Sequence, residues 1–424
     1  MSKHTNHGHN TTGTPAKVVA GSLFGGVLSA VTLVAVPFAS GSEATITGAI
    51  LIGIAIGWAL LAQLSKRLGD GSHRWAAVPA AALGLSGAAL IIFTPNSQTL
   101  DTLGWIWPPL LLALVLWMTA QTRRQPPAHR RSWLLYPVFA LMAFSAVGCS
   151  YETLQTSSGG AAAPVAGDRL LDVGGHRLNI RCVGSGSPTV VLEPGLGEST
   201  SAIARWIAPQ VARTTRVCVY DRAGHGRSDV APDADAARDL HVLLERAHVP
   251  GPYVLAGHSL GGMFVLSYAH RYPAEVGGVV LLDSMHPRQS KTAATGDMGP
   301  VLDVVPTLAR TGLARLFVDP KDGEPAAQAR QFVRDVEQMP AQLNRAAQLK
   351  TLGGRPLGVV TASTGTQPGW TQDQNNLATL SSHSFHRTVA GSTHQSLIDD
   401  PKDAAASSRA IRDVVTEIRN GEGV

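Results

Sequence analysis

The sequence predicts an all-α transmembrane bundle of about five helices, followed by an α/β domain with a mostly parallel, doubly wound sheet. Three observations support this fold class. Charged residues make up only 15% of the 424 residues and hydrophobic residues 44%, whereas soluble domains carry about 25% charged residues. Long charge-free windows follow one another in the first third of the chain. Beyond them, short β-branched runs alternate with helical stretches.

Five apolar windows predict five membrane-spanning helices. They are residues 18–42, 44–65, 75–100, 102–122 and 132–151. Each supplies about 17–25 apolar residues, the length that spans a hydrocarbon core of about 30 Å. Backbone polar groups in a bilayer must be paired internally, so each window is expected to be a helix. The third window is rich in Ala and Gly and the fifth is short, so four spans is the alternative count.

The charged residues that flank these windows predict the orientation of the bundle. Basic residues lie before the first window and in the loops after the second and fourth: Lys3, Lys17, Lys66, Arg67, Arg74, Arg123, Arg124, Arg130 and Arg131. The other two loops carry only Glu43 and Asp101. Because loops rich in Lys and Arg stay in the cytoplasm, residues 1–17 are predicted to be a cytoplasmic tail. The domain that follows five spans is then extracytoplasmic.

Charge and cysteine content exclude several classes of function. Residues 1–150 carry a net charge of +6 and the remainder −1, whereas a nucleic-acid-binding protein has a basic folded domain. The windows contain no ionisable Asp, Glu, Lys or Arg, which pumps and transporters usually need. Three cysteines are too few for a disulfide scaffold or a four-cysteine zinc site. We expect the bundle (18–150) to be a membrane anchor, and we expect no nucleic-acid partner, metal or cofactor.

The remainder of the chain predicts a linker and then an α/β domain. Residues 151–167 are small, polar and rich in Gly and Ala, which is typical of a flexible linker. The strands expected within residues 168–424 lie in 169–175, 176–184, 187–195, 215–224, 252–259, 277–284, 355–363 and 384–392. The helices expected between them include 201–213, 232–247, 260–271 and 404–419. This alternation predicts a mostly parallel sheet covered by helices.

One motif in this domain points to chemistry. Residues 257–261, Gly-His-Ser-Leu-Gly, fit the pattern G-x-S-x-G, directly after an apolar strand and directly before a helical run. In that context the serine occupies a sharp turn that exposes its hydroxyl above the sheet. Gly257 and Gly261 remove side chains that would collide across the turn. An ordinary loop serine is the alternative, because Gly and Ser are common residues.

Three further segments accompany this motif: LEPGLGES at 192–199, YDRAGHGRSD at 220–229 and GSTH at 391–394. Together with GHSLGG at 257–262 they resemble, in the same order, motifs of the α/β-hydrolase family of lipases, esterases and peptidases. The resemblance covers residues 168–420, about 60% of the chain. It implies an α/β-hydrolase domain with the chain order nucleophile, acid, histidine.

The resemblance implies that Ser259 is the nucleophile and His394 its base, since a serine hydroxyl needs an adjacent base to attack. His394 follows the last expected strand, where the family carries its histidine; a surface histidine is the alternative. Four other histidines are less suitable by position: His225, His286, His383 and His386.

Two carboxylates are candidates for the acid that orients His394. Asp283 ends the expected strand 277–284, where some family members carry the acid. Others carry it after the next strand, where the first carboxylate in this chain is Asp373. A carboxylate in this role fixes the tautomer of the histidine and stabilises its imidazolium. We favour Asp283, for which a structural carboxylate at a strand end is the alternative.

The oxyanion hole requires two backbone N–H groups aimed at the developing negative charge. The resemblance implies the amide of Leu260 for one and that of Leu196, in the loop 194–197, for the other. This loop lacks the usual His-Gly of the family. We expect Glu193 to pair structurally with Arg222 or another cation, and the turn that begins with Asp221 to be structural as well.

Two further features depend on the resemblance. Residues 285–354 form an insertion with helical stretches that resembles a cap, and caps shape the substrate site and exclude water. Cys182 and Cys218 lie in strands that are neighbours in this fold. A disulfide between them is expected if the domain is extracytoplasmic, and two buried free thiols are the alternative.

Together these features predict a membrane-anchored serine hydrolase that cleaves an ester, thioester or amide bond through an acyl-enzyme. Its expected partners are the membrane and a small-molecule or lipid-like acyl substrate. An acyltransferase of the same fold and a non-catalytic receptor or scaffold are the alternatives. Transport by the helices is disfavoured, because their windows lack charged residues.

Overall fold

The chain folds into two compact units. The computed structural model describes residues 14–35, 42–67, 73–124, 133–157, 165–231, 234–288, 299–312 and 325–421. The first unit comprises Met1–Ser158 with Met298–Val318, and the second comprises Gly159–Asp297 with Asp319–Val424. Most of the predicted cytoplasmic tail, residues 1–13, lies outside the described residues.

The first unit is helical. Its elements are α1 (Thr14–Ala35), α2 (Glu43–Arg67), η1 (Arg74–Ala76), α3 (Ala77–Phe93), α4 (Ser97–Leu103), α5 (Trp107–Arg123), α6 (Tyr136–Ser157) and α11 (Gly299–Arg310). Among the described residues, five helical segments are long and apolar enough to cross a membrane: 16–35, 43–67, 74–93, 99–123 and 133–154. Among these residues the prediction of five apolar helices is confirmed, and the alternative of four spans is wrong.

The linker differs from its prediction at its start. Helix α6 continues to Ser157, so residues 151–157, which were expected to begin a flexible linker, are helical. Glu152, Leu154 and Gln155 are good helix formers, and they continue a helix that the preceding apolar residues already nucleate. Residues 158–164 of the predicted linker lie outside the described residues.

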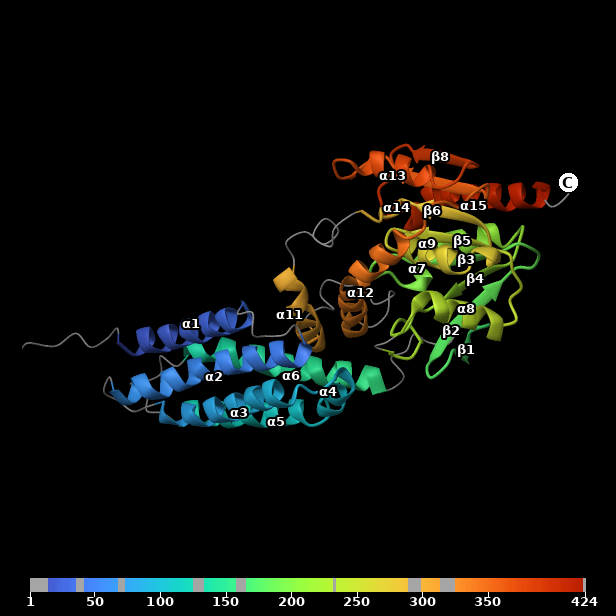
Figure 1. The fold of residues 1–424 in the computed structure, drawn as a ribbon. Helices are drawn as coiled ribbons and strands as arrows, with labels where there is room; N and C mark the ends of the chain where they lie inside the picture. Colours follow the sequence, from blue (N-terminus) through green and yellow to red (C-terminus); the bar gives the residue numbers. More distant parts are fainter. Residues whose placement is uncertain are drawn as a thin grey trace, which may run out of the picture. The chain divides into compact units, whose positions relative to one another are not determined.

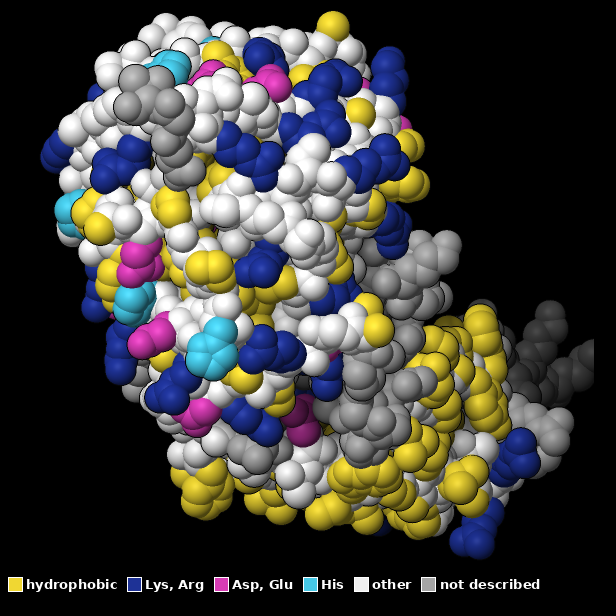
Figure 2. All heavy atoms as spheres, turned by 90° about the vertical axis from the view of Figure 1, so that its right-hand side faces the viewer, with side chains coloured by type: hydrophobic (Ala, Val, Ile, Leu, Met, Phe, Trp, Pro, Cys, Tyr) yellow, Lys and Arg dark blue, Asp and Glu magenta, His cyan; other side chains and the backbone are white. Residues whose placement is uncertain are grey.

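Small residues bring α1, α2 and α3 into close contact. A Cβ atom placed on Gly53 would lie 2.3 Å from the Cα of Ala30, and one on Gly48 would lie 2.7 Å from the carbonyl oxygen of Gly87. Close backbone approach of this kind is how helices pack when the solvent is lipid. Large apolar side chains such as Phe24, Ile92 and Leu116 point outward instead. Figure 2 shows hydrophobic side chains on the visible surface of this unit.

Helix α11 belongs to the helical unit, although sequence analysis included it in the cap insertion (285–354). Arg310 pairs through Nε with Oε1 of Glu43 and through Nη1 with Oδ1 of Asp101, both at 2.7 Å. The Oγ1 atoms of Thr47 and Thr307 lie 2.9 Å apart. The amphipathic pattern of α11 fits any apolar partner, which is why sequence did not separate it from the remainder of the insertion.

The described residues of the second unit form one eight-stranded sheet in the order β1-β2-β4-β3-β5-β6-β7-β8 (Figure 1). The strands are β1 (Arg169–Asp172), β2 (Arg177–Val183), β3 (Thr189–Glu193), β4 (Val217–Tyr220), β5 (Tyr253–His258), β6 (Val276–Leu282), β7 (Leu357–Ala362) and β8 (Ser384–Val389). The pairs β1–β2 and β2–β4 are antiparallel, and all other pairs are parallel. The predicted mostly parallel sheet is confirmed.

Helices cover both faces of this sheet. They are α7 (Thr200–Val211), α8 (Ala236–Arg246), α9 (Gly261–Arg271), α12 (Pro325–Ala346), α13 (Trp370–Ala378), α14 (Ser396–Asp399) and α15 (Pro401–Gly421). Val191 belongs to the same buried cluster as residues of α8, α9, α12 and α13. Its neighbours Val190 and Leu192 belong to the cluster on the other face, with residues of α7 and α15 and with Leu397 and Ile398 of α14. This alternation is the two-residue period of a strand that is buried on both faces.

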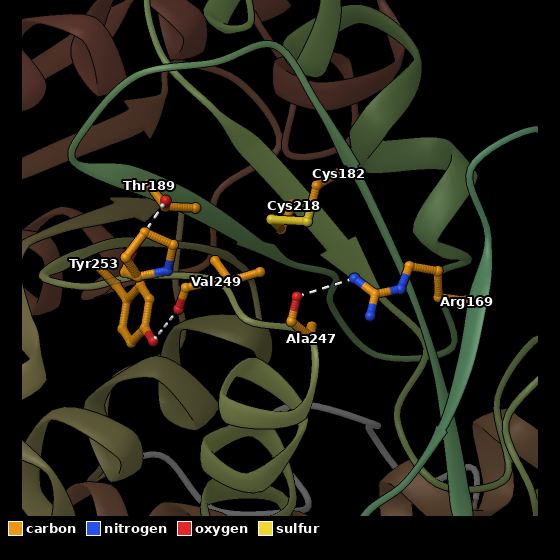
Figure 3. The surroundings of a disulfide bond; sticks show 8 residues. Arg169, Cys182, Thr189, Cys218, Ala247, Val249 and Tyr253 are labelled. Atoms are coloured by element: carbon orange, nitrogen blue, oxygen red, sulfur yellow. Dashed lines mark hydrogen bonds between the residues drawn. A yellow bond between two sulfur atoms is a disulfide. The ribbon is translucent and has the colours of Figure 1, made fainter.

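Cys182 of β2 and Cys218 of β4 form a disulfide, as Figure 3 shows. The two residues are register partners in the antiparallel pair. Beside them, Arg169 donates from Nη1 to the carbonyl oxygen of Ala247 at 2.9 Å. The bond therefore joins the antiparallel edge of the sheet to its parallel centre.

Candidate active site

Ser259 lies in a sharp turn between β5 and α9 and has a φ of +53°. A serine at positive φ is strained, and such strain is characteristic of functional turns. The flanking glycines make the turn possible. A Cβ on Gly257 would lie 2.6 Å from the carbonyl carbon of Gly261, and one on Gly261 would lie 2.4 Å from the carbonyl oxygen of Glu193. The collisions expected from sequence are present.

Asp283 and His394 are in direct contact. The Nδ1 atom of His394 lies 2.6 Å from Oδ2 of Asp283. The other carboxylate oxygen accepts from the amide of Ala362 at 3.1 Å and from Nε1 of Trp370 at 2.7 Å. The Asp283 side chain is almost fully buried, whereas that of His394 is 40% exposed. These bonds hold the carboxylate in one orientation and direct the other imidazole nitrogen, Nε2, away from it.

The competing residues have other neighbours. Asp373 lies in α13, and one of its oxygens is 3.9 Å from Nδ1 of His286. His386 bonds to Thr361 and Asn375. Of the two carboxylates left open by sequence, the geometry brings Asp283 to His394.

The loop after β3 lies against the serine. A Cβ on Gly195 would lie 2.9 Å from the Cβ of Ser259. Leu196 is half-buried and packs against the core. Leu260 is the N-cap residue of α9, where backbone N–H groups have no partner within the helix. Of the two residues expected to donate to an oxyanion, Leu260 follows Ser259 directly in the chain and Leu196 follows Gly195, which lies against the serine.

Glu193 and Arg222 form a buried ion pair, with 2.6 Å between Oε1 and Nη1. Tyr220 also donates to Glu193, and the Arg222 guanidinium lies 4.5 Å from the ring centre of Phe264. Asp221 accepts from Asn179 at 3.0 Å and from the amide of Arg227 at 3.1 Å. These contacts agree with the structural roles expected for this turn.

Sequence reasoning did not identify Asp335, which α12 brings to the same region. Its carboxylate accepts from Arg222 at 3.0 Å, from Nε2 of His225 at 3.1 Å and from the amide of Gly197 at 2.9 Å. Burial alone would raise the pKa of Asp335, but the charge of Arg222 and the bonds from His225 and Gly197 hold it well below its usual range. The insertion thus contributes directly to holding the loop beside Ser259.

A second unforeseen contact involves Glu198 and His258. A Glu198 oxygen lies 2.8 Å from Nδ1 of His258, and another bond runs from the amide of Gly195 to Glu198 at 2.6 Å. Nε2 of His258 lies 3.0 Å from the carbonyl oxygen of His394. No local sequence pattern predicts these bonds, because they join segments that are far apart in the chain.

Residues 188–321 match the family model described as the alpha/beta hydrolase fold. Together with the sheet order and the turn at Ser259, this match decides the fold of the second unit. It is an alpha/beta-hydrolase domain. In the described part of the chain, five apolar helices precede it.

Curated relatives match the hydrolase domain over part of their length. An uncharacterised protein, YbdG of Bacillus subtilis, is 30% identical over 131 residues, which are 29% of this chain and 39% of the relative. A pimeloyl-[acyl-carrier protein] methyl ester esterase of Chromobacterium violaceum is 39% identical over 109 residues, which are 25% of this chain and 40% of the relative. This chain therefore spans about two fifths of the length of these relatives.

Among solved structures, a thermophilic esterase from Thermogutta terrifontis is similar to the hydrolase domain. It is 19% identical, with a TM-score of 0.47, and the match covers 57% of this chain and 94% of the esterase. The protein Cfl2 from Burkholderia cenocepacia is 24% identical, with a TM-score of 0.45, and the match covers 58% of this chain and 95% of Cfl2.

Proposed function

We propose that this protein is a membrane-anchored serine hydrolase that cleaves an ester bond through an acyl-enzyme intermediate. Ser259 is the nucleophile, His394 the general base and Asp283 the orienting acid. The observation that carries the proposal is the 2.6 Å contact between Nδ1 of His394 and Oδ2 of Asp283, beside a serine held at positive φ. Ester cleavage is favoured over amide or thioester cleavage, because one curated relative that matches this domain is a methyl ester esterase.

In the acylation step, Oγ of Ser259 attacks the carbonyl carbon while its proton passes to Nε2 of His394. The negative charge of Asp283 stabilises the imidazolium that forms. The carbonyl oxygen becomes an oxyanion and accepts from the amides of Leu260 and Leu196. The bond to the alcohol then breaks, and the alcohol leaves with the proton held by His394.

In the deacylation step, water takes the place of the alcohol. His394 removes a proton from the water, the resulting oxygen attacks the acyl carbon, and the second tetrahedral intermediate collapses. Oγ of Ser259 recovers its proton from His394 as the carboxylic acid leaves. Each step uses the same base and the same pair of amides, so the free enzyme is regenerated.

The hydrolase domain is proposed to lie outside the cytoplasm, with the N-terminus inside. Arg310 comes from the insertion of the hydrolase domain and pairs with Glu43 and Asp101. Glu43 begins α2 and Asp101 lies in α4, at the ends of the apolar windows opposite the basic loops, and basic loops stay inside. The Cys182–Cys218 disulfide is also typical of an oxidising compartment.

The test is labelling of intact cells with a fluorophosphonate probe, in a membrane-permeant and an impermeant form. We expect both forms to label the wild type and neither to label Ser259→Ala. Labelling by the impermeant form only after lysis would overturn the orientation but retain the enzyme. Absence of labelling in lysed cells as well would favour a non-catalytic scaffold over the hydrolase.

A labelled protein can still transfer its acyl group to an acceptor other than water. Purified protein incubated with p-nitrophenyl acetate distinguishes the two reactions. A hydrolase releases acetate and nitrophenol in equal amounts at a constant rate. An acyltransferase gives one equivalent of nitrophenol and then stops until an alcohol is added.

A further inference from the structure

The two ring nitrogens of His258 both face hydrogen-bond acceptors. Nδ1 lies 2.8 Å from a carboxylate oxygen of Glu198, and Nε2 lies 3.0 Å from the backbone carbonyl oxygen of His394. An ionised carboxylate and a carbonyl can only accept. A neutral imidazole has one N–H and satisfies one of them, whereas an imidazolium satisfies both. The geometry therefore selects the cationic form of His258.

The surroundings agree with a charged pair. The His258 side chain is fully buried, and burial opposes its charge, but the Glu198 carboxylate and the bonds to Glu198 and His394 raise its pKa above the usual value. Burial would likewise raise the pKa of Glu198, yet His258 holds it below its usual range. A buried charge without such a partner would be strongly unfavourable.

Glu198 links three segments of the candidate site. It accepts from the amide of Gly195 at 2.6 Å, at the start of the loop that lies against Ser259. It holds the ring of His258, which directly precedes the serine. Through that ring it reaches the backbone of His394, whose own ring centre lies 4.5 Å from that of His258.

We propose that Glu198 is a positioning residue that acts through the His258 imidazolium to hold the His394 loop and the oxyanion loop against Ser259. This inference rests on the proposed function of Ser259 and His394. It assigns His258, the residue before the nucleophile, a positive charge as well as a structural role. In this proposal Glu198 contacts neither the bond that is cleaved nor the proton that passes from Ser259 to His394.

The charged groups around this pair determine its dependence on pH. Asp283 and His394 face His258 from the other loops of the site. Asp399 of α14 lies within the electrostatic reach of both members of the pair, and Arg205 lines a cavity of about 280 Å³ together with Glu198 and Asp399. The charged pair is intact between the lowered pKa of Glu198 and the raised pKa of His258, and it is lost as the pH rises through the pKa of His258.

The alkaline limb of the activity profile is therefore expected to report His258. In Glu198→Gln the amide oxygen still accepts from Nδ1, but the negative charge is absent. The limb should move to lower pH by about 1–3 units, the size of the effect of one nearby opposite charge. The value of kcat should fall by about 10–100-fold, as for a small displacement of the reacting groups, with KM nearly unchanged.

The experiment uses the detergent-solubilised full chain with p-nitrophenyl acetate, and measures kcat and KM across the pH range. Glu245→Gln is the matched control, because Glu245 is exposed on α8 and the chemical change is the same. Glu198→Asp keeps the charge and should restore the position of the limb in part. If the alkaline limb of the activity profile lies at the same pH in Glu198→Gln and in Glu245→Gln, the inference is overturned.

Failure of the proposed function and misfolding of Glu198→Gln give different results from failure of this inference. A wild-type protein that neither hydrolyses the ester nor reacts with a fluorophosphonate would overturn the proposed function itself. If Glu198→Gln does not fold, ring-¹⁵N spectra of histidine-labelled wild type decide. Ordinary histidines lose their ring charge near about pH 6.5, so one doubly protonated ring that persists above their range and is missing in His258→Gln supports the inference. Its absence from the wild type contradicts it.

Discussion

His394 and Asp283 are joined by a 2.6 Å contact between Nδ1 and Oδ2 across 111 residues of sequence. The second oxygen of Asp283 is held by Trp370 and by the amide of Ala362, so the carboxylate has little freedom to rotate. A carboxylate fixed in this way selects the tautomer with a proton on Nδ1 and a lone pair on Nε2. That tautomer is the one a general base requires.

Replacing Asp283 should therefore cost far more activity than replacing Asp373. Asp283→Asn keeps the size of the side chain but removes the charge and presents an amide to Nδ1, which favours the wrong tautomer. We expect kcat for p-nitrophenyl acetate to fall about 10³–10⁴-fold. Asp373→Asn, the control from the other candidate position, should retain kcat within a few fold. Equal losses in the two variants, or a larger loss in Asp373→Asn, would assign the acid to Asp373.

The parts that were predictable from sequence are those encoded by local pattern. Five charge-free windows predicted five apolar helices, and the strand-turn-helix context of Ser259 predicted its turn. The assignment of Leu196 and Leu260 to the oxyanion hole comes from the motifs in which they stand and stays a prediction. In each case a short stretch of residues carries the physical requirement, such as the glycines that a sharp turn needs.

The parts that were not predictable depend on long-range contacts. Asp335 meets the amide of Gly197 across 138 residues, and Glu198 meets His258 across 60. In the sequence, a carboxylate on an amphipathic helix, such as Asp335, cannot be distinguished from an ordinary surface charge until its partner cations are known. The choice between Asp283 and Asp373 also required the register of strand ends, which sequence gives only to within a few residues.

Asp335 is expected to stabilise the hydrolase domain over a wide range of acidity. Its pKa is depressed by Arg222 and His225, so its contribution is complete above the unfolded value of about 3.9. That contribution is lost only as the pH falls through the lower folded value. Asp335→Asn leaves Arg222 buried with one carboxylate partner fewer, and should lower the free energy of unfolding by about 3–5 kcal/mol. Thermal unfolding measured between pH 4 and pH 8 checks this expectation.

Asp229→Asn is a suitable comparison, because Asp229 is a half-exposed carboxylate paired with Arg177 at 2.9 Å. An exposed pair contributes only about 0–1 kcal/mol. The Asp335 variant should also lose activity, since the single oxygen of an asparagine cannot replace both carboxylate oxygens, which together accept from Arg222, His225 and the amide of Gly197. Equal stabilities of the two variants would contradict the role assigned to Asp335.

The disulfide predicts a specific thiol count. Denatured, unreduced protein should expose one reactive thiol, Cys149, and reduction should raise the count to three. In Cys149→Ala the counts should be zero and two. The bond closes a loop of 36 residues, so reduction should lower the free energy of unfolding by about 2–4 kcal/mol. Three thiols before reduction would show that Cys182 and Cys218 are free.

Docking of α11 on the helical unit can be tested by cross-linking. The Oγ1 atoms of Thr47 and Thr307 are 2.9 Å apart, so cysteines at both positions, in a Cys149→Ala background, should form a disulfide under mild oxidation. Arg310→Gln removes the partner of Glu43 and Asp101. The side chains of Arg310 and Asp101 are 20% and 34% exposed, so the pair is only partly buried. Its loss should loosen α11, and the cross-link yield should fall.

The matched control for this experiment is Arg288→Gln, which changes an arginine of the same insertion outside α11 and should leave the yield unchanged. The same cysteine pair reports orientation. An impermeant maleimide added to intact cells should label Thr47→Cys when α11 is released by Arg310→Gln, because the residues that α11 contacts then face the outside. If that cysteine reacts only after lysis, Glu43 and the hydrolase domain are cytoplasmic. In that case the basic loops lie outside, and the charge of the loops does not determine the orientation of this bundle.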